Sequence, residues 1–354
     1  MKMQIEIYNM TVLNDKLNIS LEAVCDSFSS LLWDIEYYKC GAFEVYIAAS
    51  PRNIEIFQTG RIVGRDDDKE HFGLIESVEL ETNAEDGDYL IIKGRFLMCL
   101  LERRIIYPTF NFTKLVSYSQ IVMNVVQHNA CTAGIRKIPG LVVGCSSGSC
   151  WDAKTKLQVS YDNLMEWVYT ICEKIGGTAN IRLIKTNNEQ YEMIFELSQG
   201  TDRSILQEVN PHIIFSDRYN NLLSFTYFTD TSFKKNYAYV LGKGEGEKRK
   251  RTTYFEGTEP SSLERHEVYV DAKDISDEEQ ENGETKPLSE EEYSELLKEK
   301  GKQSLVPITM KSESQIAVQS TQFQYGVDYF IGDFVTVEHH RFGIRQNKIQ
   351  LVGM

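Results

Sequence analysis

Short runs of alternating hydrophobic and polar residues dominate the first hundred positions of the chain. Residues 43–47 alternate strictly, which is the period-two pattern of a half-buried β-strand. Similar runs, separated by turn residues, predict further strands at 3–9, 11–19, 31–36, 60–64, 72–81 and 89–96. Regularly spaced short strands are typical of antiparallel β folds. Residues 1–112 are therefore predicted to form a small N-terminal β-barrel or sandwich.

The pattern changes to helical spacing after residue 112. Ser117 is suited to cap a helix over 117–126, and residues 160–172 predict a second helix with its apolar residues on one face. Gly176 and Gly177 follow as a helix-ending signal. Strands are predicted at 179–183 and 191–197. Residues 113–203 are thus predicted to be an α+β insertion between β regions.

β-type patterns return beyond residue 203. Strands are predicted at 222–228 and 236–241, and a Gly332-Asp333 turn precedes Val335-Thr336-Val337, which alternates like a half-buried strand. Residues 204–256 and 303–354 are predicted to form a second small β-barrel domain. The expected fold class is mainly β with an α+β insertion.

Residues 257–302 interrupt this second β region. Residues 274–300 hold eleven acidic residues against three lysines. A helix is predicted to begin at Ser289 with a capping box to Glu292 and to end at Gly301. Its apolar stripe is narrow, comprising Tyr293, Leu296 and Leu297. We expect this acidic insertion to lie outside the β cores, so that its replacement by a short linker would leave folding nearly intact.

Composition and charge narrow the class of protein. Aromatic residues make up 11% of the 354 residues, which favours β structure and large contact surfaces. The net charge of −14 opposes non-specific binding to nucleic acids and to anionic membranes, and no specific nucleic-acid binding is expected. The N-terminal residues do not match a signal peptide, and no run of about 18 apolar residues predicts a membrane span. We expect a protein made in a cytoplasm.

Seven cysteines at irregular spacing predict free, mostly buried thiols. The alternative is a pair between Cys145 and Cys150, which flank a short serine-rich loop. No second Cys/His pair at zinc spacing accompanies them.

No other motif predicts a catalytic, cofactor or metal site. Residues 242–247 are glycine-rich but lack the helix that follows a phosphate loop, so they predict a hairpin connection. The basic run 248–251 is interpreted as surface charge. His339 and His340 are adjacent on a strand and face opposite ways. Residues 144–148 lack the spacing of a nucleophile elbow. The chain is therefore expected not to be an enzyme and to need no cofactor.

Several segments in a fixed order carry a resemblance to a known family. They are residues 72–76, 89–95, 100–106, 119–129, 224–227, 236–246, 332–337 and 343–344. In this order and spacing the chain resembles the siphovirus-type tail hub (baseplate hub) proteins of phages and prophages of Gram-positive bacteria.

The resemblance implies two β-barrel domains that build a pseudo-six-fold ring in a homotrimer. Such a trimer is an adaptor that joins the tail tube or distal tail protein to a spike or tip protein and surrounds the channel for DNA or the tape-measure protein. It implies a place in a virion tail or tail-like particle assembled in the bacterial host cytoplasm. The alternatives are a carbohydrate- or receptor-binding β module of a tail and a cell-wall hydrolase.

Overall fold

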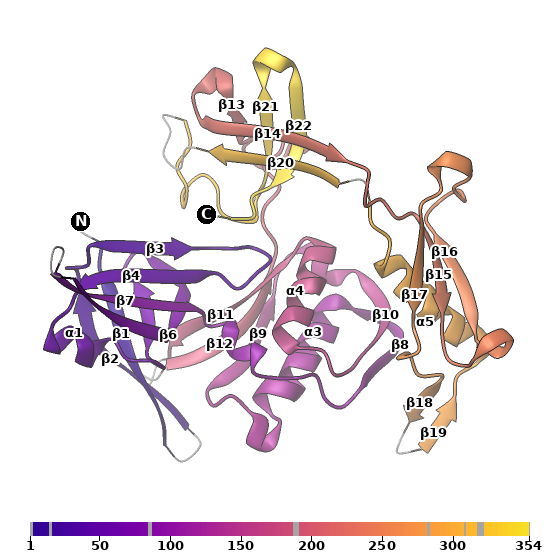
Figure 1. Ribbon diagram of the computed structural model, residues 1–354, viewed down its shortest axis with the longest axis horizontal. Helices are drawn as coiled ribbons and strands as arrows, with labels where there is room; N and C mark the ends of the chain where they lie inside the picture. Colours follow the sequence, from indigo (N-terminus) through magenta and orange to yellow (C-terminus); the bar gives the residue numbers. More distant parts are fainter. Residues whose placement is uncertain are drawn as a thin grey trace.

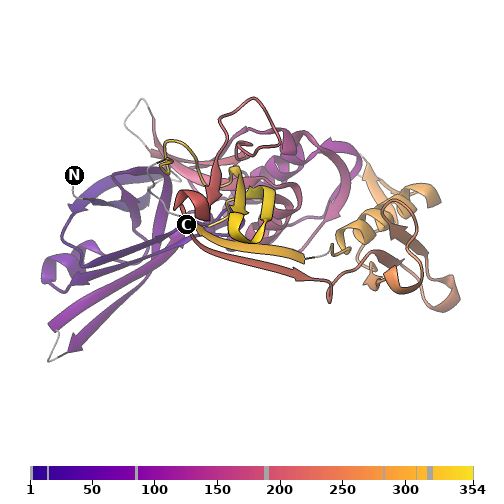
Figure 2. The same cartoon turned by 90° about the horizontal axis from the view of Figure 1, so that it is seen from above.

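The computed structural model describes residues 3–13, 16–83, 87–186, 191–281, 284–307, 309–316 and 322–353. An N-terminal sheet lies at one end of the molecule, a middle α+β body follows it, and an inserted unit with one long helix lies at the other end (Figure 1). A small C-terminal β body lies beside the middle of this row, as Figure 2 shows from above. Four hydrophobic clusters correspond to this arrangement.

The N-terminal sheet has seven strands in the order β2-β1-β5-β6-β7-β4-β3. Ile5 and Ile7 on β1 and Trp33 on β3 belong to one core, so the sheet is curled. The described edges β2 and β3 are not paired, and the sheet is open where the sequence predicted a barrel or sandwich. The elements are β1 (Ile5–Leu13), β2 (Lys16–Cys25), β3 (Ser30–Asp34), β4 (Ala42–Ala48), α1 (Pro51–Ile56), β5 (Ile62–Arg65), β6 (Asp68–Asn83) and β7 (Gly87–Phe96).

The middle body packs against the other face of this sheet. Tyr8, Phe72 and Leu74 share a core with the helices and strands of the middle body, so the N-terminal sheet is buried on both faces. The elements are α2 (Cys99–Glu102), β8 (Phe110–Ser117), α3 (Tyr118–Val126), η1 (Gln127–Cys131), η2 (Gly134–Arg136), β9 (Leu141–Ser146), η3 (Ser149–Asp152), β10 (Lys154–Val159), α4 (Leu164–Ile175), β11 (Thr178–Lys185) and β12 (Tyr191–Ser198).

The C-terminal body consists of two small sheets, β13-β21-β22 and β14-β20, over a core of Phe215, Tyr329, Val335 and Val337. Thr336 is also buried, and its hydroxyl is satisfied by donating a hydrogen bond to the Asn347 carbonyl at 2.7 Å. β21 is thus buried at three successive positions, where the alternation predicted a half-buried strand. The elements are β13 (Ile214–Ser216), η4 (Asp217–Tyr219), β14 (Leu222–Asp230), β20 (Thr309–Ile316), β21 (Phe334–His339), η7 (His340–Phe342) and β22 (Ile344–Gln350).

The inserted unit is a three-stranded sheet, β16-β15-β17, covered by α5. Its two ends meet, since Lys235 and Val306 exchange backbone hydrogen bonds of 2.7 and 2.9 Å. A separate hairpin, β18–β19, precedes the helix. The elements are β15 (Tyr237–Leu241), η5 (Gly246–Lys248), β16 (Arg251–Phe255), η6 (Ser262–Glu264), β17 (Glu267–Asp271), β18 (Glu278–Glu281), β19 (Glu284–Pro287) and α5 (Glu290–Gln303).

This unit differs from the predicted domain map. The expected boundary at residue 257 falls between β16 and β17, which flank β15 in one sheet. The acidic segment was expected to lie outside any core, yet α5 buries Tyr293, Leu296 and Leu297 against that sheet. A narrow apolar stripe suffices here because the sheet that it covers is itself small.

The helix caps and helix ends that the sequence predicted were confirmed at some positions and wrong at others. The N-cap at Ser117, the capping box of Ser289 and Glu292, and the helix end at Gly176 are confirmed. However, α4 starts later than expected, with Asn163 as its N-cap. The helix does not end at Gly301, since α5 continues to Gln303. Glycine is needed at 301 because a Cβ there would meet Val240 at 2.7 Å.

Candidate interaction surfaces

A cleft of about 1060 Å³ lies between the N-terminal sheet, the β11–β12 strands and the segment that precedes β21. Ion pairs link the elements that line this cleft. Arg182 on β11 bonds Glu196 on the neighbouring strand and Glu70 on the N-terminal sheet, at 2.5 and 3.1 Å. These contacts tie the middle body to the first sheet.

Asp68 is the most strongly held carboxylate of this cleft. It accepts hydrogen bonds from the Trp33 indole at 3.0 Å and from the backbone amides of Glu70 and His71, and it lies 2.9 Å from the His71 ring nitrogen. Burial raises its pKa, but the contact with His71 and the other donors outweigh burial and lower the pKa to about 2. The carboxylate is therefore ionised and anchors the start of β6.

The Gly332-Asp333 turn singled out in the sequence lies at the junction of three bodies. Asp333 is buried and accepts from the Thr201 amide at 2.7 Å and from the Arg203 guanidinium at 2.8 Å. Gly332 has φ +90°, and a Cβ there would meet the Tyr37 ring at 2.1 Å. Glycine is thus required both by the backbone conformation and by the close approach of Tyr37 from the connection between β3 and β4.

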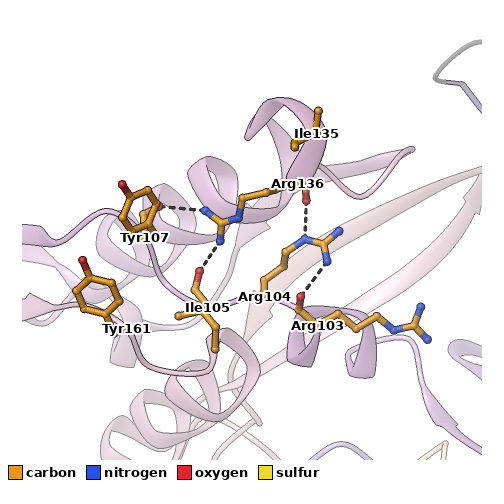
Figure 3. Close-up of a pocket in the computed structure, with 7 residues that line it drawn as sticks. All are labelled: Arg103, Arg104, Ile105, Tyr107, Ile135, Arg136 and Tyr161. Atoms are coloured by element: carbon orange, nitrogen blue, oxygen red, sulfur yellow. Dashed lines mark hydrogen bonds between the residues drawn. The ribbon is translucent and has the colours of Figure 1, made fainter.

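A second hollow, which we call the arginine pocket, lies on the middle body (Figure 3). Arg104 donates to the backbone carbonyls of Arg103 and Arg136. Arg136 in turn donates to the carbonyls of Ile105 and Tyr107. The pocket is lined by Arg103, Arg104, Ile105, Tyr107, Ile135, Arg136 and Tyr161.

In the described part of the chain, the glycine-rich, basic and histidine motifs noted in the sequence make contacts that support the fold. Residues 242–247 connect β15 to β16 as a hairpin, as predicted. In the basic run, Arg249 pairs with Asp271 and Lys250 with Glu290. His339 lies 3.2 Å from Asp217 and packs on Phe225, while His340 is exposed.

All seven cysteines are free thiols, Cys145 and Cys150 included. Burial raises the pKa of Cys150 to about 11. Among the described residues, no group of three His, Cys, Asp or Glu side chains is placed to hold a metal ion. No helix in the described part of the chain is long and apolar enough to cross a membrane.

Comparison with known proteins decides the family. The model of the siphovirus ReqiPepy6 Gp37-like protein family matches residues 5–350. The chain belongs to this family. The resemblance to siphovirus tail proteins that the ordered segments carried is thereby confirmed. No curated protein matches this Gp37-like chain in sequence.

Three solved tail proteins, two of them from prophages, share its fold over nearly the whole length. The tail protein from Neisseria meningitidis MC58 has a TM-score of 0.55 at 13% identity, covering 100% of this chain and 91% of that one. The 43 kDa tail protein of prophage MuSo2 from Shewanella oneidensis has a TM-score of 0.53 at 10% identity, covering 99% and 93%. Prophage tail protein gp18 from Listeria monocytogenes EGD-e has a TM-score of 0.51 at 11% identity, covering 100% and 89%.

Proposed function

We propose that this Gp37-like chain is a structural hub protein of the tail tip or baseplate. In this role it is a homotrimeric adaptor that joins the tail tube or distal tail protein to a spike or tip protein and surrounds the central channel with its tape-measure protein. The observation that carries the proposal is the end-to-end fold match with three tail proteins, because it involves every body of the chain and not a single shared module.

The unpaired edges of the β14–β20 sheet support the proposal that the chain works in an assembly. β14 and β20 form a sheet of two strands, and neither has a further partner among the described strands. Leu223, Tyr227 and Phe228 on β14 are 68%, 46% and 48% exposed. Exposed apolar side chains on an unpaired edge favour aggregation unless a partner covers them. In the proposed ring, neighbouring copies cover these strands and complete the barrel-like domains.

The cleft favours this adaptor over the two alternatives. A carbohydrate-binding groove would present several exposed aromatic rings, whereas Tyr37, Phe96 and Tyr169 are buried in the cleft walls and Phe330 is 47% exposed. A glycoside hydrolase would need a pair of carboxyl groups that face the substrate across an open cleft. Here the carboxylates of Asp68, Glu196 and Asp333 accept hydrogen bonds from cationic or neutral donors that fix the walls. The cleft thus supports a role in holding the bodies together.

The copy number in assembled tails tests the proposal. Tail or tail-like particles released from the bacterial host would be purified, and the tip complex would be weighed by native mass spectrometry and imaged. We expect three copies in a ring around the channel. Two or six copies, or a position away from the tail tip, would overturn the proposal.

A further inference from the structure

One face of the small sheet in the inserted unit is not covered by α5. Ala238 and Val240 point toward α5, and because successive strand residues point to opposite sides, their neighbours point away from it. In these three fully described strands, Leu241 is the only aliphatic side chain on the outward side. We call this side the aromatic face, after its four rings, Tyr237, Tyr239, Phe255 and Tyr269.

The aromatic face is turned away from the rest of the chain. Each residue of a helix advances by about 100°, so Leu297 of α5 faces the sheet while Glu295 and Glu299 lie on the opposite side of the helix. These two carboxylates form ion pairs of 2.6 and 3.0 Å with Lys156 and Lys174 of the middle body. The helix therefore lies between the sheet and the middle body, and the aromatic face lies on the outer side of this unit at the end of the molecule (Figure 1).

Two tyrosine rings on this face are open to solvent and held in place. Tyr239 and Tyr269 are 38% and 58% exposed, and the register pairs them on neighbouring strands, so they lie side by side. The Tyr239 hydroxyl accepts a hydrogen bond from Arg265 and donates one to Glu267, both at 3.1 Å. The Tyr269 hydroxyl accepts from Arg249 at 3.0 Å. Rings that are fixed in advance lose little conformational entropy when a ligand stacks on them.

Further planar groups extend this surface. The Tyr237 ring lies 5.0 Å from Tyr239 and stacks on Phe255 with an angle of 11° between the ring planes. The Arg265 guanidinium covers Tyr237 at 3.5 Å from the ring centre. Rings and guanidinium together form a broad planar surface of the kind on which a flat ligand stacks.

The charges on the aromatic face compensate one another. The charged side chains that point outward from the three strands or bond to their tyrosines, together with their ion-pair partners, are Arg249, Arg251, Arg265, Glu259, Glu267 and Asp271. Arg265 alone holds two carboxylates, those of Glu259 and Glu267, at 2.8 and 2.7 Å. Because positive and negative side chains are equal in number, the face favours a ligand without net charge.

A neutral saccharide matches these features. A pyranose ring presents C–H bonds on its faces, which pack on aromatic rings, and hydroxyl groups around its edge, which need donors and acceptors. The carboxylates of Glu267 and Asp271 flank Tyr269 along β17 and are 49% and 51% exposed, so they can accept hydrogen bonds from sugar hydroxyls. Carboxylates are depleted from the cores of protein interfaces, which disfavours a second protein on this face.

We propose that the aromatic face of the inserted unit binds a neutral saccharide, with pyranose rings stacked on Tyr239 and Tyr269. The exposed carboxylates of Glu267 and Asp271 accept hydrogen bonds from its hydroxyl groups. This site is distinct from the cleft, whose walls bury most of their aromatic rings. It adds a binding activity to the adaptor role and does not depend on the number of copies in the tail tip.

Saturation-transfer NMR on the full-length chain tests the class of ligand. The neutral probes are maltotriose, chitotriose and mannotriose, and a hyaluronan tetrasaccharide is the acidic probe. We expect transfer to the ring C–H protons of at least one neutral probe, and weaker transfer to hyaluronan. No transfer to any neutral probe would overturn the proposal, and so would stronger transfer to hyaluronan.

Substitutions locate the site. Tyr269→Ala should weaken binding of the best neutral probe about tenfold because it removes a stacking ring, whereas Tyr269→Phe keeps the ring and should stay within about twofold of wild type. Tyr219→Ala is the matched control, because Tyr219 is 39% exposed and lies on η4 of the C-terminal body. NMR titration measures the affinities, and circular dichroism checks the fold. Equal affinities of Tyr269→Ala and wild type would contradict the assignment.

Two further outcomes separate this inference from its competitors. If Tyr269→Ala weakens self-association in sedimentation experiments and no saccharide binds, the face is a contact between copies and the proposal fails. Three copies in the tail tip without saccharide binding would leave the adaptor standing and remove this site. Saccharide binding by a chain that does not form three copies in the tip would keep the site and remove the trimer.

Discussion

Asp333 shows how one residue connects bodies that are distant in sequence. Its carboxylate bonds Arg203 and the Thr201 amide, and a third donor, the Phe330 amide, lies at 3.0 Å. Replacing a buried carboxylate leaves the partner guanidinium without a counter-ion, and the lost amide contacts add to this cost. The junction between the middle and C-terminal bodies therefore depends on this side chain.

Asp333→Ala should lower the free energy of unfolding by about 3 kcal/mol, because breaking a buried ion pair costs roughly this much. Asp152→Ala is the control, since Asp152 is exposed and its change should stay within about 0.5 kcal/mol. Chemical denaturation followed by circular dichroism measures both. Equal stabilities for the two variants would show that the turn does not fasten the junction.

Asp68 should make stability depend on pH in the acid range. Its pKa in the folded chain is about 2, below the ordinary 3.8, so its stabilising contribution is present above pH 3.8 and is lost as the pH falls toward 2. Asp68→Asn should cost about 2 kcal/mol at neutral pH, and the difference from wild type should shrink between about pH 4 and pH 2. Urea melts across this range test it. A difference that stays constant with pH would refute the assignment.

The sequence predicted some of these sites and missed others for physical reasons. Gly332-Asp333 stood out because a turn signal lies beside a strand pattern, but its buried partners at 201–203 are far away in sequence. The arginine pocket gave no signal, because its side chains come from residues 103–107, 135–136 and 161. Only the fold brings these segments together, and their spacing in the chain follows no periodic pattern.

At the scale of elements, α5 shows that the composition of a segment does not by itself predict whether the segment packs in a core. Its N-terminus was predicted residue by residue, since capping depends on local chemistry. Its place in a core was not predicted, because eleven acidic residues in 274–300 indicate a solvated segment. The acidic face is solvated, and three apolar side chains on the other face are buried against β15 and β16. A small sheet needs only a narrow stripe to cover it.

Leu297→Ala should destabilise the inserted unit by about 3 kcal/mol, the usual cost of a cavity left by a buried leucine. The amides of β15 should then exchange with solvent faster, while those of β4 and β7 keep their protection, because the unit has its own core. Leu263→Ala is the control, since Leu263 is 93% exposed. Unchanged exchange in β15 after Leu297→Ala would contradict the packing of α5.

At the scale of the molecule, the chain resembles a row of bodies with one unit inserted into a loop. The predicted order of β, α+β and β regions matches the sheets along the chain. Barrel closure was inferred from turn spacing, which does not encode which edge strands meet, and the described sheets are open. The insertion was expected at 257–302, whereas the backbone bonds between Lys235 and Val306 enclose a larger unit. Long-range strand pairing, absent from local patterns, sets these boundaries.

The inserted unit should therefore be removable as a whole but not in part. Replacing residues 236–305 with a short Gly/Ser linker keeps the ends that already meet and leaves the pairing of β14 with β20 intact. The loop closure costs little free energy. The deletion removes three ion pairs with the rest of the described chain, Lys156–Glu295, Lys174–Glu299 and Lys234–Glu264, which are partly exposed and should contribute about 1 kcal/mol or less each. The remaining clusters draw no buried residue from the unit.

This shortened chain should stay soluble and melt within a few degrees of wild type, as judged by size-exclusion chromatography and circular dichroism. Deleting only 274–300 should instead give an aggregating chain, because it removes α5 and exposes the apolar face of β15 around Ala238 and Val240. Soluble folding after the partial deletion, together with failure after the complete one, would show that α5 is dispensable and that the other bodies depend on the unit.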